Sequence, residues 1–121
     1  MTRFELIEAV RQDFSTAKKE DILRLANDLE HRLYREIFEP AGQGHSPTQS
    51  DDLHATLLAS TGYSTIYLSY VTAHFALQDG DHTRANACSE LFNRSFAELA
   101  VAVRRAHPVV RKTRLTGGNL L

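Results

Sequence analysis

Six histidines are the residues of this chain that most readily do chemistry, because imidazole binds metal ions and transfers protons near neutral pH. They are His31, His45, His54, His74, His82 and His107. None forms a His-Glu-x-x-His pair or lies beside a Cys-x-x-Cys motif, the spacings that bring zinc ligands together. The run Asp79-Gly80-Asp81 lacks the alternate acids and the closing glutamate of a calcium loop. The sequence therefore predicts no metal site and no cofactor. Asp79-Gly80-Asp81 is instead predicted to be a break between two helices.

Nucleophilic and phosphate-binding patterns are also missing. Cys88 is the single cysteine; it lies on an apolar helical stripe and has no neighbouring base that would activate a thiolate. No glycine-rich phosphate loop occurs, and Asn93-Arg94-Ser95 matches a glycosylation site only by chance in a chain without an export signal. We therefore expect no catalytic residue and do not expect an enzyme.

Length and composition restrict the class of protein. A chain of 121 residues fits one domain and buries roughly two thirds of its unfolded surface, so its core needs no disulfide or structural metal. Hydrophobic residues make up 42%, and no apolar run approaches the roughly 18 residues that a membrane span requires. Because Glu5 precedes any apolar block, we expect no signal peptide and no membrane partner, and an intracellular or virion protein.

The elements that would position these residues are predicted to be helices. Thr2 can cap a first helix, whose apolar residues keep helical spacing and which stops near Asp13. Ser15 or Thr16 can cap a second helix. The sequence thus predicts two helices in the first third of the chain, with a short turn between them.

The second helix is followed by a long loop. Its apolar stripe runs over residues 22–37, and Pro40 is predicted to end it because the residue before a proline is pushed out of the α region. Residues 40–52 are rich in Gly, Pro, Ser and Asp, which favour turns, and a connection of this length is usually functional or disordered. Residues 53–60 fit a short strand and a helical turn equally well, so both interpretations stay open.

Two further helices complete the predicted fold. The third, Tyr63 to about Leu77, is apolar on more than one side, which indicates a central position. Gly80 can take the left-handed conformation after it, and Asp81 can cap the fourth helix. The fourth helix has an unbroken stripe of residues at spacings of three and four. These are Ala85, Cys88, Leu91, Phe92, Phe96, Leu99, Val103 and Ala106. We expect an all-α bundle of about four helices, with an extended C-terminal tail after Pro108.

Charge is segregated along the chain, although the net charge is only -1. Residues 36–81 carry acids and no lysine or arginine; the acids are Glu36, Glu39, Asp51, Asp52, Asp79 and Asp81. Residues 99–121 carry cations and no acid; the cations are Arg104, Arg105, Arg111, Lys112 and Arg114. This pattern predicts two complementary surfaces, of the kind that head-to-tail contacts between subunits require.

Two features remain as candidates for binding. Tyr63, Tyr67 and Tyr70 are typical of a core, but tyrosine also suits interfaces because its apolar ring has a polar tip. The basic segment after residue 108 fits a solvated tail, yet its leucines favour burial against a partner. The sequence thus leaves two interpretations open for each feature: core or interface for the tyrosines, and solvated tail or bound segment for the basic end.

A set of short motifs occurs in a fixed order over roughly residues 18 to 108. The motifs are Ile22-Leu23-Arg24, Leu29-Glu30, Tyr34-Arg35-Glu36-Ile37, Leu57-Leu58, Tyr63-Ser64-Thr65-Ile66-Tyr67, Asp79-Gly80-Asp81 with Arg84 and Asn86, Phe92-Asn93, and Arg105-Ala106-His107-Pro108. In this order they resemble the head-to-tail connector, or adaptor, proteins of tailed bacteriophages and prophages. The hairpin of the third and fourth helices carries the strongest part of the resemblance.

The resemblance implies a structural virion protein. Copies of such a protein form a dodecameric ring beneath the portal, extend the DNA channel and give the tail its attachment surface. The implied partners are the portal protein, neighbouring copies, the next tail or neck protein and, without sequence specificity, the genomic DNA. The implied location is the neck of the virion, and the host cytoplasm before assembly. Residues 1–108 would form the connector domain and residues 109–121 a docking tail.

The residues suggest how such a ring would use its surfaces. We expect the C-terminal part of the chain to order on the portal, through apolar burial and ion pairs. The residues predicted to dock there are Arg105, Arg111, Lys112, Arg114, Leu115, Leu120 and Leu121. Tyr63, Tyr67 and Tyr70 are predicted to form the contact between subunits. Glu39, Asp51 and Asp52 are predicted to face the channel or the next ring, where acids would repel DNA phosphates.

Two other classes of function remain open. A small DNA-binding regulator would place the basic end on phosphates, although the chain shows no short recognition helix after a tight turn. A helical phage-encoded modulator of a host protein would use the tyrosine face and would remain a monomer or dimer.

Overall fold

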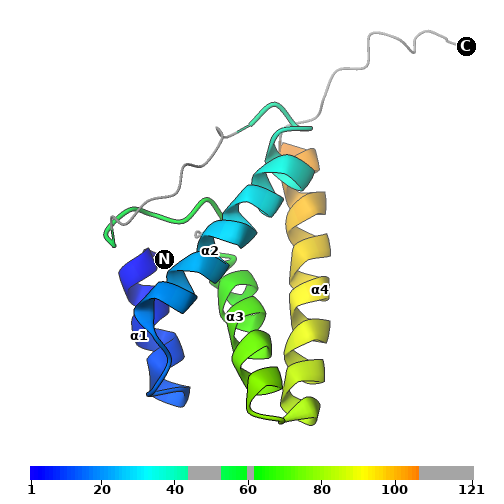
Figure 1. Cartoon of the computed structure of the whole chain (residues 1–121). Helices are drawn as coiled ribbons and strands as arrows, with labels where there is room; N and C mark the ends of the chain where they lie inside the picture. The colour runs from blue at the N-terminus through cyan, green and yellow to red at the C-terminus, as the bar shows by residue number, and fades with distance from the viewer. Residues whose placement is uncertain (44–52, 60–61, 107–121) are drawn as a thin grey trace, which may run out of the picture.

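The computed structural model describes residues 1–43, 53–59 and 62–106, and these residues form an all-α bundle (Figure 1). Its helices are α1 (Arg3–Asp13), α2 (Lys19–Leu33), α3 (Ser64–Gln78) and α4 (His82–Ala106), and a π-helical turn, η1 (Tyr34–Phe38), continues α2. The predicted fold class and the long connection between the second and third helices are confirmed. Residues 109–121, the predicted docking tail, lie outside the described residues.

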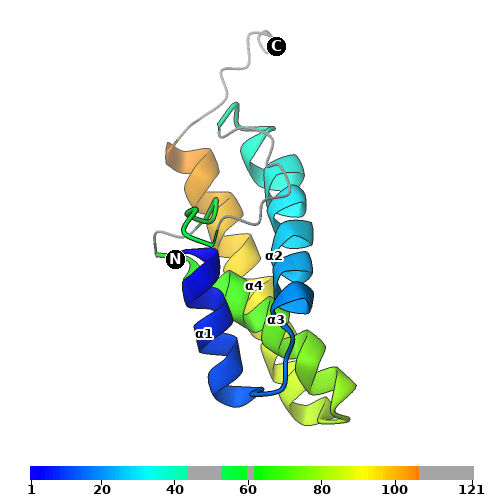
Figure 2. The ribbon, with the colours of Figure 1, turned by 60° about the vertical axis from the view of Figure 1, so that its left-hand side comes forward.

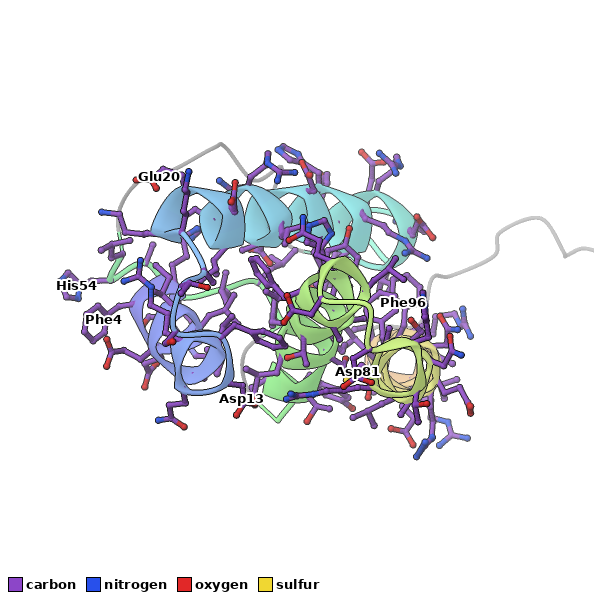
Figure 3. The ribbon with its side chains drawn as sticks, turned by 60° about the horizontal axis from the view of Figure 1, so that its bottom comes forward. Phe4, Asp13, Glu20, His54, Asp81 and Phe96 are labelled. Carbon is purple, nitrogen blue, oxygen red and sulfur yellow. The ribbon has the colours of Figure 1, made fainter. Side chains whose placement is uncertain are left out.

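The four helices are arranged with α2 across the other three. Figure 1 shows α1, α3 and α4 side by side, with α3 in the middle, and Figure 3 shows the same order seen from the lower end. The core lies where α2 meets α1 and α3; its fully enclosed residues include Leu6, Leu29 and Ile66, each at 0% exposure. α4 therefore forms one edge of the bundle.

α1 begins as the sequence predicts. Thr2 Oγ1 accepts a hydrogen bond from the backbone N–H of Glu5 at 3.2 Å, and a Glu5 carboxylate oxygen accepts one from the N–H of Thr2 at 2.8 Å. These reciprocal bonds form a capping box, which satisfies two amide groups that the first turn of a helix leaves free. The helix ends at Asp13, also as predicted.

The predicted cap of α2 is wrong. The helix begins at Lys19 with Lys18 in the capping position, and no side chain caps it. Residues 14–18 instead form a turn that buries Ala17, whose carbonyl accepts a hydrogen bond from Arg11 Nε at 3.0 Å. Glu20 and Asp21 in the first turn compensate the positive end of the helix.

The end of this helix differs from the expectation in its geometry. The N–H of Glu39 bonds to the carbonyl of Tyr34 at 2.8 Å, five residues back, so the helix widens into a π-turn before Pro40. Glu39 itself stays in the α region, with φ of -60° and ψ of -47°. The helix does stop near Pro40, but the expectation that the residue before the proline leaves the α region is wrong.

The segment 53–59 is neither a strand nor a helix. It runs beside the start of the chain, where Thr2 and Thr56 form an isolated antiparallel bridge (Figure 2). The N–H of Leu57 donates to the carbonyl of Met1 at 3.0 Å, and Leu57 is 1% exposed. The alternating apolar residues of the sequence thus pack one side of this segment onto the bundle.

The hairpin of α3 and α4 follows the sequence closely. α3 is central as predicted, since Ile66, Tyr67 and Val71 are each 0% exposed. Gly80 has φ of +80°, a left-handed conformation that glycine adopts without steric cost, and Asp81 Oδ1 caps α4 by accepting the N–H of Arg84 at 3.1 Å.

The apolar stripe of α4 is buried only along its middle line. Four of its predicted residues are buried, namely Ala85, Phe92, Leu99 and Val103, and Ser95 is buried with them. Cys88, Leu91 and Phe96 are half-buried, and Ala106 is exposed. A helix at the edge of a bundle contacts its neighbours on one side only, so the flanks of its stripe remain partly accessible.

Candidate functional site

The carboxylate of Glu30 is buried in the core of the bundle. It lies on α2 with 4% exposure and accepts the backbone N–H of Leu58 at 3.2 Å and 2.9 Å through its two oxygens. One of these oxygens also accepts the Tyr67 hydroxyl at 2.5 Å. Glu30 therefore fastens the segment 53–59 and α3 to α2.

Tyr67 completes this polar cluster. Its hydroxyl accepts the N–H of Ala59 at 2.8 Å while it donates to Glu30. Burial raises the pKa of the Tyr67 hydroxyl, and the adjacent Glu30 charge and hydrogen bond raise it further, while the Arg3 charge acts in the opposite direction. Tyr67 thus stays protonated and serves as a donor inside the bundle.

The expectation that Tyr67 forms a contact between subunits is wrong for this fold. Its side chain is 0% exposed, so its ring and hydroxyl are already enclosed by their own chain. Tyrosine with a buried hydroxyl needs a hydrogen-bond partner, and Glu30 supplies it here.

A buried cation lies in the same region of the core. Arg3 is 4% exposed, and its Nε and Nη2 donate to Asn27 Oδ1 at 3.3 Å and 3.0 Å. From the sequence, no role is assigned to Arg3, Asn27 or Glu30, although Glu30 belongs to one of the motifs that carry the resemblance. A signal was present, because Leu23, Asn27 and Glu30 recur at spacings of four and three and so share the buried face of α2.

The two other predicted interface tyrosines are half-buried, and they line two different hollows. Tyr70 lines a hollow of about 410 Å³ between α2, α3 and α4, and its ring packs on Phe92 with centroids 5.3 Å apart. Arg32 of α2 closes one side of this hollow. Its guanidinium lies 5.4 Å from the centroid of Phe92 and 4.8 Å from that of Phe96, both on α4.

Tyr63 lines the second hollow, of about 440 Å³, near the end of α4. The exposed Arg105, which is predicted to dock on the portal, lines the same hollow together with Val101, which is 38% exposed. The fold thus brings together one predicted subunit-interface residue and one predicted docking residue.

The acids that are grouped in the sequence are divided in space. Glu36 and Glu39 lie at the end of α2, whereas Asp79 and Asp81 lie at the turn between α3 and α4, at the other end of the bundle (Figure 1). Glu36 pairs with Arg32 at 3.1 Å. The described acids therefore do not form one surface, because α3 spans the bundle between them.

Eight of the predicted site residues lie outside the described residues. They are Asp51, Asp52, Arg111, Lys112, Arg114, Leu115, Leu120 and Leu121. Glu39 is described and is exposed beside Pro40. The predictions made for the loop acids and the docking tail stay predictions.

Metal ligands do not gather in the described ranges. Among residues 1–43, 53–59 and 62–106, no group of three or more His, Cys, Asp or Glu side chains could hold an ion. His54 stacks on the exposed ring of Phe4, with centroids 6.2 Å apart, at the outer side of α1 (Figure 3). No helix in the described part of the chain combines the length and apolarity that a membrane span needs.

Comparison of the chain with protein-family models, with curated proteins and with solved structures finds no match.

Proposed function

We propose that this chain is a structural virion protein, a head-to-tail connector of a tailed bacteriophage or prophage. In this proposal its copies form a ring on the portal protein, extend the DNA channel and present a surface to the next tail or neck protein. The ordered motifs of the α3–α4 hairpin are the basis of the resemblance, and the geometry of that hairpin supports the proposal.

The observation that carries the proposal is the placement of Tyr63 and Tyr70. A ring of identical subunits is built from heterologous contacts, so each subunit needs two different surfaces that fit each other. Tyr70 lies in the hollow that α2 helps to form, whereas Tyr63 lies in a separate hollow toward the far end of α4. Partly exposed aromatic side chains at two distinct sites are suited to such a pair of surfaces.

The end of α4 supports the position of the docking segment. Arg104 and Arg105 are exposed in its last turn, and the chain continues from Ala106 into the basic residues 109–121. In this proposal, these exposed cations and those in the sequence of residues 109–121 would pair with acidic groups of the portal. Glu30 supports a structural role for the protein. Its buried carboxylate accepts hydrogen bonds from Leu58 and Tyr67 of its own chain.

A truncation that ends at Pro108 tests the docking role. We expect the full chain to sediment with portal rings and the truncated chain to remain a small species. The described helices all end before this point, so circular dichroism of the truncated chain serves as the folding control. Equal binding of the two chains to portal rings would show that residues 109–121 have no docking role.

A matched pair of aromatic substitutions tests the subunit contact. Tyr63→Ala removes a half-buried ring from the hollow near the end of α4, and Phe4→Ala removes a ring that is 45% exposed on α1. We expect Tyr63→Ala to prevent ring formation on the portal and Phe4→Ala to permit it, as seen by electron microscopy. Rings of normal appearance from the Tyr63 variant would refute the assignment of this hollow.

A further inference from the structure

The side of α4 that faces away from the bundle has an unusual composition. Six exposed residues recur there at spacings of four and three, and they lie opposite the buried line through Phe92 and Leu99. They are Thr83, Ala87, Glu90, Arg94, Ala97 and Val101. No described helix lies beyond this face, because α4 is the edge of the bundle (Figure 1). Ala97 and Val101 also line the hollow that contains Tyr63, so a contact here in the free chain would exclude a ring contact at that hollow.

This face is self-complementary when two copies of α4 run antiparallel. A two-fold axis at the level of residue 92 places Glu90 opposite the partner's Arg94, and Arg94 opposite the partner's Glu90. The same axis places Ala87 opposite the partner's Ala97, where two small side chains allow the backbones to approach closely. Contacts of this kind, in which residue i meets j and j meets i, define a closed dimer.

The two central charges select the antiparallel orientation. A parallel pair would place Glu90 against Glu90 and Arg94 against Arg94, which is repulsive. In the described part of the chain, neither side chain forms an ion pair. Both charges are therefore available to a second copy.

The ends of the helix add to this complementarity. Arg104 and Arg105 lie in the last turn of α4, while Asp79 and Asp81 lie in the turn that precedes its first residue. In the antiparallel pair the cations of one copy approach the acids of the other at both ends. The two helix dipoles also run in opposite directions, which is the favourable arrangement.

We propose that the free chain forms a two-fold symmetric dimer in which the outward face of α4 pairs antiparallel with the same face of a second copy. The dimer is a property of the free chain and does not rest on the proposed role in the virion. Its partner is a second copy of this chain because the face fits itself in charge and in side-chain size.

Charge exchange at the two central positions provides the test. Glu90→Arg and Arg94→Glu, each made alone, place like charges opposite each other, so each variant should dimerise about tenfold or more weakly than the unmodified chain. The double variant Glu90→Arg/Arg94→Glu restores opposite charges and should dimerise again. An equimolar mixture of the two single variants should form a heterodimer, because one chain then carries two cations and the other two acids. Sedimentation at increasing protein concentration measures all four.

A control variant and two milder substitutions distinguish loss of the dimer from loss of folding. Glu8→Arg makes the same change of charge on the exposed side of α1 and should leave the dimer intact. If a single exchange reduces the helix content, Glu90→Gln and Arg94→Gln must still weaken the dimer. The proposal is overturned if the unmodified chain stays monomeric at every concentration, if it forms a larger ring on its own, or if the single variants dimerise unchanged. A mixture of the single variants that stays monomeric would also overturn it.

Discussion

The helices α2 and α4 differ in how much of their surface the bundle uses. α2 buries eight of its 15 residues, including the polar Asn27 and Glu30, whereas α4 buries five of its 25. α2 contacts α1, α3 and η1, while α4 lies at the edge and packs mainly on α3. α2 thus connects the other elements of the fold, whereas α4 is buried along one line from Ala85 to Val103 and leaves its outer surface exposed.

The largest expected difference between the two helices comes from the same substitution made on each. Glu30→Ala leaves the N–H of Leu58 and the hydroxyl of Tyr67 without their acceptor inside the core, and should lower the free energy of unfolding by about 3 to 4 kcal/mol. At protein concentrations too low for dimerisation, Glu90→Ala on the exposed side of α4 should change it by less than about 0.5 kcal/mol. Urea unfolding followed by circular dichroism measures both; equal effects would contradict the assigned roles of the two helices.

A smaller effect is expected from the hydroxyl that joins α3 to α2. Tyr67→Phe keeps the buried ring but removes a donor to Glu30 and an acceptor for Ala59, so the free energy of unfolding should fall by about 1.5 kcal/mol. Tyr63→Phe, at a half-buried position, serves as the control and should change it by less than about 0.5 kcal/mol.

The same hydroxyl predicts a dependence on alkaline pH. Its pKa is raised in the folded state, whereas in the unfolded chain it ionises near the ordinary value of 10.0. The contribution of the protonated hydroxyl is therefore fully present below pH 10.0 and is lost as the pH rises above that value. Unfolding measured across this range should show a steeper decline for the unmodified protein than for Tyr67→Phe, and parallel declines would contradict the raised pKa.

The cap of α4 should contribute about as much as caps of other helices. Asp81→Ala removes the acceptor of the Arg84 N–H and should cost about 1 kcal/mol of unfolding free energy. Asp79→Ala, two residues earlier, is a matched control without that bond. Hydrogen exchange should become faster in the first turn of α4 for the Asp81 variant alone; unchanged exchange there would mean that the cap is not needed to hold the edge helix.

The smallest effect concerns the start of α1. Hydrogen bonds from Thr2 lower the pKa of the Glu5 carboxylate from its ordinary value of 4.5. The stability that this charge contributes is therefore present above pH 4.5 and is lost as the pH falls through the lowered pKa of the folded state. Glu5→Gln should be less stable than the unmodified protein at neutral pH and equal to it in acid. A difference that persists in acid would show that the charge is not its cause.

The sequence predicts the fold well where local chemistry decides it. The Thr2 cap, the left-handed Gly80 and the Asp81 cap each depend on residues within one turn, and all three are confirmed. The prediction that Ser15 or Thr16 caps α2 is wrong because both residues lie in a turn that packs Ala17 into the core. This packing is a tertiary effect, which the local sequence does not show. The ambiguous segment 53–59 is likewise fixed by its contacts with the first residues of the chain.

The candidate sites are less predictable because they depend on which elements meet. Tyr63 and Tyr70 share a helix, and the sequence does not show that they line different hollows. Glu30 looks like an ordinary surface acid until its donors, which lie 28 and 37 residues away, are brought to it. The segregation of charge along the sequence is misleading for the same reason. Because α3 spans the bundle, Glu36 and Glu39 lie at one end of it and Asp79 and Asp81 at the other.

The contact between Arg32 and the rings of Phe92 and Phe96 has a mechanical consequence. A guanidinium lying over two aromatic faces has no single fixed register, unlike an aliphatic side chain held between neighbours. The edge helix, which packs mainly on α3, is therefore also joined to α2 by a contact that does not depend on close interlocking of apolar side chains.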